Sequence, residues 1–240
     1  MENKEFLEEL IEKSKKIGIE INEEEANKFY NYMNLLLEWN EKINLTAITA
    51  PKEVILKHFV DSITINKYIE DKNTIIDIGT GAGFPGIPLK IINKDKKFIL
   101  VDSLNKRINF LNEVSRELNL ENIELIHARA EELAVNSNYR EKCDIVTSRA
   151  VARLATLIEY MLPFVKVGGK CICMKGANIE EELNEAKKAI EVLGGEIEVV
   201  EKFYLPDTDM ERNIVVIKKV KNTPNKYPRK AGMPSKQPII

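Results

Sequence analysis

The chain has 240 residues, of which 44% are hydrophobic and 7% aromatic, so it can build an ordinary globular core but is short for two full domains. No apolar run approaches the roughly 20 residues that a membrane span needs, and the acidic, amphipathic N-terminus is unlike a secretory signal. We therefore expect a cytoplasmic protein with no membrane partner. The net charge of −2 hides an asymmetry, because eight basic and no acidic residues follow Glu211.

The N-terminal quarter of the chain is helical in pattern. Apolar residues recur with helical spacing over residues 4–43, in two separate stripes that predict two helices. Asn22, followed three residues later by Glu25, predicts the start of the second helix, because these side chains can cap free backbone N–H groups. A third, short helix is expected after Pro51. We interpret residues 1–70 as a helical cap that has no independent core.

From residue 74 the pattern changes to short apolar strands that alternate with helical segments. This alternation predicts a mostly parallel sheet with helices on both faces. Two β-rich runs near the C-terminus have no helix between them and predict a closing hairpin. The predicted fold class is α/β, a Rossmann-like, mostly parallel seven-stranded sheet formed by residues 71–220. The expected strands are 74–79, 97–102, 122–127, 143–148 and 170–175 and hairpin strands within 196–205 and 212–220; the expected helices lie around 85–92, 104–119, 151–162 and 179–193.

A glycine-rich loop follows Asp77, at the end of the first expected strand. Residues 81–86 fit the dinucleotide pattern G-x-G-x-x-G, whereas residues 77–83 fit the acidic-x-G-x-G-x-G pattern of S-adenosylmethionine sites. Both ligands need glycine because they approach the main chain closely. A pyrophosphate is disfavoured beside Asp77, while an ammonium and a sulfonium are attracted to it. We therefore favour the methyl donor over a nicotinamide cofactor, with contacts at Gly79 and Gly81.

Acidic residues end the next two strands. Asp102 ends the second strand, where a carboxylate can bind both ribose hydroxyls of a nucleoside, although a helix N-cap is the alternative. Ala130 and Glu131 follow the third strand, where an adenine edge would reach the rim of the sheet. Glu131 is as well explained as an acidic residue in the first turn of a helix.

The loop after the fourth strand, within CDIVTSRAVARL, contains no N-P-P-Y-like tetrapeptide of the kind that amino-directed adenine methyltransferases use. Cys143 precedes that strand and so lies at the wrong end for a nucleophile; we interpret all three cysteines as core residues. No metal-ligand cluster is evident. His58 and Asp61 share a helical face, which either marks a site or is a polar pair satisfied within one helix.

The remaining rim side chains are cationic: Arg149, Arg153, Lys175 and Arg212. Arginines there can grip phosphate or the O6 and N7 atoms of guanine, although each one alone is also explained as a surface salt bridge. Guanine N7 carries an in-plane lone pair and loses no proton on methylation. Positioning and electrostatics would therefore suffice without a general base, and these four residues are our candidates for orienting a substrate.

The C-terminal tail, residues 221–240, is basic and contains four prolines, so we expect it not to hold regular structure. A basic tail on an acidic body is typical of an arm that binds a polyanion such as nucleic acid. The alternative is a solvated terminus whose lysines aid solubility.

Several segments are characteristic of one known family: NLTAI (44–48), KHFVDSI (57–63), DIGTGAGFPGIPLKI (77–91), VDSLNKRINFL (101–111), IVTSRAVARL (145–154), ERNIVVIKK (211–219) and the tail TPNKYPRKAGMPSKQPI. Through them the sequence resembles the RsmG (GidB, glucose-inhibited division protein B) methyltransferases over nearly its whole length. The resemblance implies a class I methyltransferase that modifies guanine N7 in the decoding-region loop of bacterial 16S rRNA. It also implies cofactor contacts at Gly79, Phe84, Ala130, Glu131 and Arg149, and a cap and tail that help to contact RNA.

The hypothesis from the sequence is a monomeric, cytoplasmic enzyme that uses S-adenosylmethionine, releases S-adenosylhomocysteine, needs no metal and acts on 16S rRNA or the small ribosomal subunit. Two other classes stay open. One is a nicotinamide-dependent oxidoreductase, which calorimetry with NAD(H) and S-adenosylhomocysteine would distinguish. The other is a non-catalytic RNA-binding protein with a vestigial pocket, which an assay of methyl transfer would exclude.

Overall fold

The computed structural model describes residues 1–69, 73–149 and 151–240, and its centre is one seven-stranded sheet. The strand order is β3-β2-β1-β4-β5-β7-β6. The first five strands run parallel, and β7 is antiparallel to both β5 and β6. The predicted fold class is therefore confirmed. The strands are β1 (Thr74–Ile78), β2 (Lys97–Asp102), β3 (Ile123–His127), β4 (Cys143–Arg149), β5 (Val165–Lys175), β6 (Gly195–Tyr204) and β7 (Glu211–Lys219).

Chain order reverses between β1 and β4, which lie side by side at the centre of the sheet. From β1 the chain moves outward to β2 and β3, and from β4 it moves outward in the opposite direction. At such a switch point the loops after the two strands diverge and leave a crevice at the carboxyl ends. The loop after Ile78 and the loop after Arg149 therefore frame the place where a ligand is expected.

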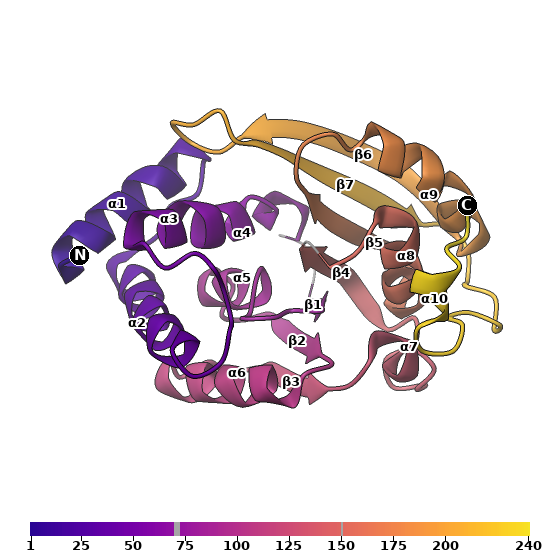
Figure 1. Cartoon of the computed structure of the whole chain (residues 1–240), viewed down its shortest axis with the longest axis horizontal. Coiled ribbons are helices and arrows are strands. Elements are labelled where there is room, and N and C mark those ends of the chain that lie inside the picture. The colour runs from indigo at the N-terminus through magenta and orange to yellow at the C-terminus, as the bar shows by residue number, and fades with distance from the viewer. Residues whose placement is uncertain (70–72, 150) are drawn as a thin grey trace.

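Helices cover both faces of the sheet (Figure 1). The N-terminal helices lie on the same face as α5 and α6, and α8 and α9 cover the other face. The helices are α1 (Asn3–Lys16), α2 (Glu23–Asn40), α3 (Pro51–Val54), the π-helical segment η1 (Ile55–Val60), α4 (Asp61–Ile63), the 3-10 turn η2 (Asn66–Tyr68), α5 (Gly86–Ile92), α6 (Asn105–Glu117), α7 (Ala130–Leu133), α8 (Leu154–Met161), the 3-10 turn η3 (Leu162–Phe164), α9 (Glu180–Val192) and α10 (Met233–Lys236).

Residues of each strand alternate between two hydrophobic cores. Ile75 and Phe98 pack with the N-terminal helices, whereas Ile76 and Ile99 pack with α8 and α9. This period of two is what a parallel sheet buried on both faces requires. The core therefore fixes the register of the central strands, and with it the position of the loops at their carboxyl ends.

The N-terminal cap shares its core with the sheet. Phe6, Phe29, Tyr32 and Phe59 pack ring against ring, and the hydroxyl of Tyr32 donates a hydrogen bond to the carbonyl of Ala82 in the glycine-rich loop. The predicted capping box of α2 is present, with Asn22 and Glu25 each bonding the backbone of the other. The proposed division between residues 70 and 71 lies outside the described residues.

The C-terminal tail packs against the body of the protein, and apart from the short helix α10 it has no regular secondary structure, as its prolines predicted. Arg140 donates to the carbonyls of Thr223 and Tyr227, and Arg229 forms an ion pair with the buried Glu159 at 2.6 Å. The short helix α10 then packs on α8. The prolines prevent a long helix or strand, but side-chain bonds from the body satisfy the backbone of the tail instead.

All three cysteines are buried and free, which confirms their interpretation as core residues. Burial raises the pKa of Cys143 to about 12, so this thiol stays protonated. The Sγ atoms of Cys171 and Cys173 lie 3.9 Å apart on one face of β5. One difference from expectation is the start of β5, which begins at Val165 rather than near residue 170.

Candidate active site

Asp77, near the end of β1, fixes the shape of the glycine-rich loop by hydrogen bonds. Its Oδ2 accepts hydrogen bonds from Thr80 Oγ1 at 2.6 Å and from the Gly86 N–H at 3.0 Å, so both ends of the loop are tied to one carboxylate. The side chain is fully buried, and this burial raises the pKa of Asp77 to about 7. Asp77 Oδ1 has no partner among the described residues. The acidic residue of the motif thus fixes the shape of the loop and keeps one acceptor atom unused.

Gly79 allows the loops after β1 and β4 to touch. Its φ is +69°, and a Cβ placed there would lie 2.7 Å from Cγ2 of Val151. Any side chain at this position would push the two loops apart and add backbone strain. Glycine is therefore required at the switch point itself.

A cavity of about 470 Å³ opens above this loop. Gly79, Gly81 and Phe84 line it from below, and Asp102 and Arg107 line it from the end of β2 and the start of α6. Among the described residues, Nε of Arg107 is buried without a partner, so one donor at this wall is available to a polar ligand.

Asp102 already has several partners in this wall. It accepts from the backbone N–H groups of Gly81 and Leu104, both at 2.9 Å, and from the guanidinium of Arg107 at 3.2 Å. Asp102 is not the N-cap of α6, because Leu104 holds that position; the bond from the Leu104 N–H to Asp102 lies just before the helix. The carboxylate also holds the glycine-rich loop against β2, a role that the sequence did not suggest.

A smaller cavity of about 130 Å³ continues the first one toward β3. Ala130, Glu131 and Tyr160 line it, and it shares Gly79 and Asp102 with the larger cavity. Glu131 lies in the first turn of α7 and accepts a hydrogen bond from the N–H of Gly232 in the tail, at 2.9 Å. Together the two cavities form one trough across the carboxyl ends of β1, β2 and β3.

A third cavity, of about 320 Å³, also borders Arg149 and is lined in addition by Lys57, Lys175, Phe203 and Arg212. His58 and Arg149 line both this cavity and the trough. The third cavity therefore meets the trough at these two side chains, and its polar lining is mainly cationic.

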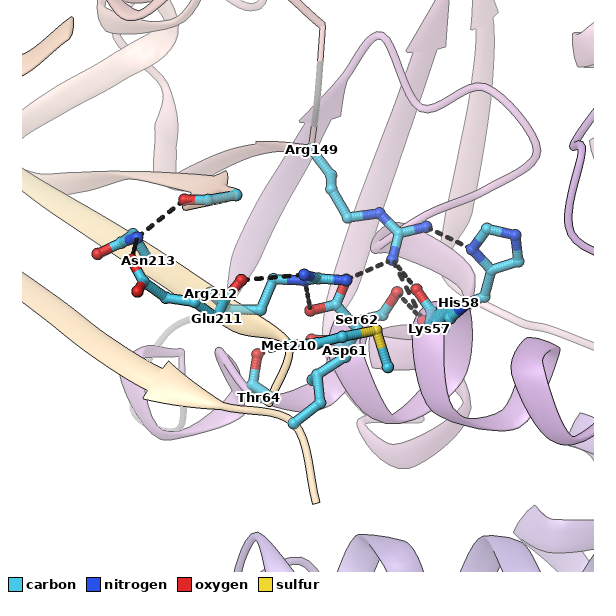
Figure 2. A network of polar contacts seen from close by, with 12 residues as sticks. Lys57, His58, Asp61, Ser62, Thr64, Arg149, Met210, Glu211, Arg212 and Asn213 are labelled. Carbon is cyan, nitrogen blue, oxygen red and sulfur yellow. Dashed lines mark hydrogen bonds and ion pairs between the residues drawn. The ribbon is translucent and has the colours of Figure 1, made fainter. Parts of the chain in front are cut away.

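Arg149, at the end of β4, is the centre of a polar network that joins the cap to the sheet (Figure 2). Its Nη1 donates to Asp61 Oδ2 at 3.0 Å and to the carbonyl of Lys57 at 3.1 Å, and its Nη2 donates to His58 Nδ1 at 3.1 Å. The guanidinium also lies 4.9 Å from the ring centre of Phe84. Arg149 is thus held on three sides and cannot swing freely.

His58 is neutral in this network. An arginine only donates hydrogen bonds, so Nδ1 of His58 must be the acceptor, and the ring proton lies on Nε2, where it faces Thr46 Oγ1 at 2.8 Å. Burial, and next the positive charge of Arg149, lower the pKa of His58 to about 3. With its lone pair engaged, His58 is not a free general base.

His58 and Asp61 do not satisfy each other within the helix, which was one of the two interpretations of their spacing. Both instead bind Arg149, from a strand far away in the sequence. The π-helical segment η1, which contains His58 and ends next to Asp61, widens the helix at this point.

The four cationic candidates have different surroundings. Arg149 and Arg212 meet at Asp61, whose Oδ1 accepts from Arg212 Nε at 3.2 Å. Lys175 lines the third cavity, but its ammonium is bound by Glu182 and by the carbonyl of Ala152, both at 2.6 Å. Arg153 is more than half exposed, pairs with Glu185 at 2.8 Å and lines none of the three cavities.

Arg107 and Thr46 were not among the candidates, and Asp61 was considered only together with His58, as one of two interpretations of their spacing. Asp61 and Thr46 lie in the segments KHFVDSI and NLTAI, and Arg107 follows the second strand within VDSLNKRINFL. The sequence shows where each segment lies along the chain, but not how close its side chains come to the end of the sheet in the folded protein. Among the described residues, no group of three or more His, Cys, Asp or Glu side chains could hold a metal ion. No helix there is long and apolar enough to cross a membrane.

Solved structures that share this fold include two S-adenosylmethionine-dependent methyltransferases. A SAM-dependent O-methyltransferase from Thermotoga maritima matches 79% of this chain and 72% of its own length, with a TM-score of 0.52 and 17% identity. A SAM-dependent methyltransferase from Aquifex aeolicus matches 75% of this chain and 97% of its own, with a TM-score of 0.52 and 17% identity. The fold is therefore that of a Rossmann-like methyltransferase.

Sequence relatives give the family. A family model described as "GidB: rRNA small subunit methyltransferase G" matches residues 25–215. Ribosomal RNA small subunit methyltransferase G of Acetivibrio thermocellus is 55% identical over 96% of this chain and 95% of its own, and that of Clostridium tetani is 53% identical over 93% and 94%. The chain belongs to the GidB family of rRNA methyltransferases. S-adenosylmethionine, the cofactor in the names of the two solved structures, fits a methyltransferase of this family.

Proposed function

We propose that this protein transfers the methyl group of S-adenosylmethionine to N7 of a guanine in the decoding-region loop of bacterial 16S rRNA. The observation that carries the proposal is the meeting of two cavities at His58 and Arg149. One cavity has the glycine-rich floor and acidic wall that a nucleoside-linked amino acid requires, and the other is lined by cations. A donor in the first and a base in the second would face each other across Arg149.

The trough fits the cofactor in three respects. The backbone at Gly81 is open, since the nearest atom to an added Cβ is 4.0 Å away. Asp102 lies where ribose hydroxyls would reach the end of β2, and Ala130 and Glu131 lie where an adenine edge would reach the end of β3. Phe84 and Arg149 would close the trough at the reacting end. When bound there, S-adenosylmethionine supplies an electrophilic methyl group on a positively charged sulfur.

The third cavity fits the acceptor. Guanine N7 uses its lone pair to take the methyl group, loses no proton, and leaves the ring with the positive charge that the sulfur gives up. No proton acceptor is therefore needed, which agrees with the neutral, fully engaged His58. Arg212 and Arg149 would orient the base through O6 or its phosphate, and Phe203 offers an apolar surface for the ring.

The partner we propose is 16S rRNA, alone or within the small ribosomal subunit, and we place the protein in the cytoplasm as a monomer. Exposed lysines of the tail, such as Lys230 and Lys236, would add phosphate contacts that weaken as salt rises. These contacts would position the RNA without choosing the base.

Methyl transfer from radiolabelled S-adenosylmethionine to 16S rRNA and to 30S subunits from a strain that lacks this gene tests the proposal. We expect one labelled guanine, modified at N7. Arg212→Gln should lower the rate of transfer by about 100-fold, as expected for loss of a preorganised cationic group. Arg153→Gln is the matched control, because Arg153 pairs with Glu185 outside the cavities, and it should stay within about twofold of the wild type. If neither 16S rRNA nor 30S subunits become labelled while the protein still binds the cofactor, the proposed activity is wrong, and an RNA-binding protein without methyl transfer is the alternative.

A further inference from the structure

Asp61 is a buried carboxylate that joins two arginines at the wall of the third cavity (Figure 2). Its Oδ2 accepts from Arg149 Nη1 at 3.0 Å and its Oδ1 accepts from Arg212 Nε at 3.2 Å. The three residues come from α4, β4 and β7, which are far apart in the sequence. One side chain thus sets the distance between two cations that would otherwise repel each other.

We propose that Asp61 is a positioning residue for methyl transfer, which acts through Arg149 and Arg212 and balances the positive charge of the acceptor cavity. The inference rests on the proposed function and adds to it a residue whose two carboxylate oxygens are each bound by an arginine. Its role has two parts, one geometric and one electrostatic.

The geometric part follows from the hydrogen bonds of Arg212. Nε is bound to Asp61 and Nη1 to the carbonyl of Glu211 at 3.0 Å, so the plane of the guanidinium is fixed at two points. Nη2 has no partner among the described residues, and Arg212 lines the cavity. A fixed guanidinium with one free donor edge is what orientation of a planar base requires.

The electrostatic part follows from a count of charges around the cavity. Lys57 pairs with Glu53, and Lys175 pairs with Glu182, so each lysine has its own carboxylate. Arg149 and Arg212 share Asp61 alone among the described ion pairs. A guanine becomes cationic as N7 is methylated, and two unbalanced guanidiniums beside it would oppose that change. The shared carboxylate lowers this opposition while both donors stay in place.

The test is single-turnover methylation of 16S rRNA or 30S subunits by Asp61→Asn, which keeps the shape of the side chain and removes its charge. We expect the rate of the chemical step to fall by about 100-fold, as for other preorganised electrostatic groups. The Kd for RNA should stay equal or become tighter, because a negative charge has been removed. A merely structural role would instead lower stability and RNA affinity with the chemical step unchanged. Asp144→Asn is the matched control, since this acid accepts from the Thr74 N–H and pairs with Lys166 near the amino end of β4, whereas Arg149 lies at the carboxyl end.

A double-mutant cycle with Arg212→Gln tests the path of the effect. If Asp61 acts through Arg212, the double variant should lose no more than about threefold beyond the worse single variant, whereas independent effects would multiply. Arg212→Lys provides a second measurement should Asp61→Asn fail to fold, because Arg212 is partly exposed and lysine keeps its charge without the fixed fork. We expect it to be slow in the chemical step.

Each failure has its own signature. An active wild type with Asp61→Asn within threefold of its rate would overturn the role of Asp61 and leave the proposed function standing. A wild-type rate for Arg212→Lys would likewise overturn the role of Asp61 and leave the proposed function unaffected. An inactive wild type, tested on both RNA and subunits, would count against the proposed function itself.

Discussion

His58 shows how one side chain is fixed by its neighbours. Arg149 occupies the lone pair of Nδ1, Thr46 faces Nε2, and the ring stacks on Phe84 with centroids 4.4 Å apart. A proton on Nδ1 would break the bond to Arg149 and place two positive charges together. The imidazole therefore serves as a neutral spacer between the cap and the reacting end of the trough.

The protonation of His58 predicts how stability depends on pH. Its pKa is lowered from 6.5 to about 3 in the folded protein, so the unfolded chain binds this proton more readily. The stability contributed by the neutral ring is complete above pH 6.5 and is lost as the pH falls toward 3. Between pH 7.5 and pH 5 the wild type should lose about 2 kcal/mol more unfolding free energy than His58→Asn does. Urea denaturation at both pH values measures this difference, and equal losses would contradict it.

Single residues were predictable where a local pattern carried the chemistry. Asp77 and the glycines were assigned to the loop from their spacing alone, and the structure places them there. Asp61 could not be given a role, because its partners Arg149 and Arg212 are 88 and 151 residues away in the sequence. Only the fold brings these three charges together.

The glycine-rich loop between β1 and α5 is the element on which the trough depends, and its glycines are not equivalent. Gly83 has a φ of +100°, and a Cβ there would lie within 2.9 Å of Ile87, Tyr32 and Leu111. Gly81 has a φ of +62° but open space around it. Gly83 therefore serves the packing of the loop against the cap, whereas Gly81 keeps the backbone accessible to a ligand.

Alanine at these two positions should separate folding from cofactor binding. Gly83→Ala should lower the free energy of unfolding by roughly 3–5 kcal/mol, through backbone strain and overpacking together. Gly81→Ala should lower it by only about 1 kcal/mol, because strain alone applies, yet it should weaken S-adenosylmethionine binding. Urea denaturation and calorimetry measure the two effects. Equal stability losses for both variants would show that the loop is not packed as described.

Most elements of the sheet were predicted because their signals are local. The alternation of apolar strands with amphipathic helices predicted the parallel core. Two β-rich runs without a helix between them predicted the antiparallel hairpin of β6 and β7. The π-helical form of η1 was not predicted, since the residues Ile55–Val60 have an ordinary helical pattern. The position of the cap over the trough also could not be predicted, because it depends on aromatic packing between distant segments.

In the whole molecule, the tail runs from the end of β7 to the smaller cavity of the trough. Lys219 is fully buried and donates to the carbonyl of Leu162 and to Thr223, and Glu159 is buried against Arg229. Farther along, Gly232 bonds Glu131 at the wall of the smaller cavity. The tail is therefore part of the folded body as well as a carrier of basic residues.

Deletion of residues 221–240 should consequently destabilise the protein as well as alter RNA binding. Loss of Arg229 leaves the carboxylate of Glu159 buried without its partner, a change that costs about 3–5 kcal/mol. Affinity for S-adenosylmethionine should fall too, because Glu131 loses its bond to the tail. Thermal unfolding and calorimetry test both effects, and an unchanged melting temperature would refute this account of the tail.

The double variant Lys230→Gln and Lys236→Gln separates the two roles of the tail. Both lysines are exposed, so their replacement removes charge and leaves the buried anchors intact. Stability and cofactor affinity should stay at the wild-type level, while the salt dependence of RNA binding becomes shallower. An unchanged salt slope would show that these lysines make no contact with phosphate.

Two cavities that meet at Arg149 would place a methyl donor beside a guanine of 16S rRNA. Mapping of N7-methylated guanines in 16S rRNA, from cells with this gene, without it and with it restored, tests whether they do. We expect one guanine in the decoding-region loop that is methylated with the gene, unmodified without it, and methylated again on restoration. An identical guanine profile in all three strains would contradict this expectation.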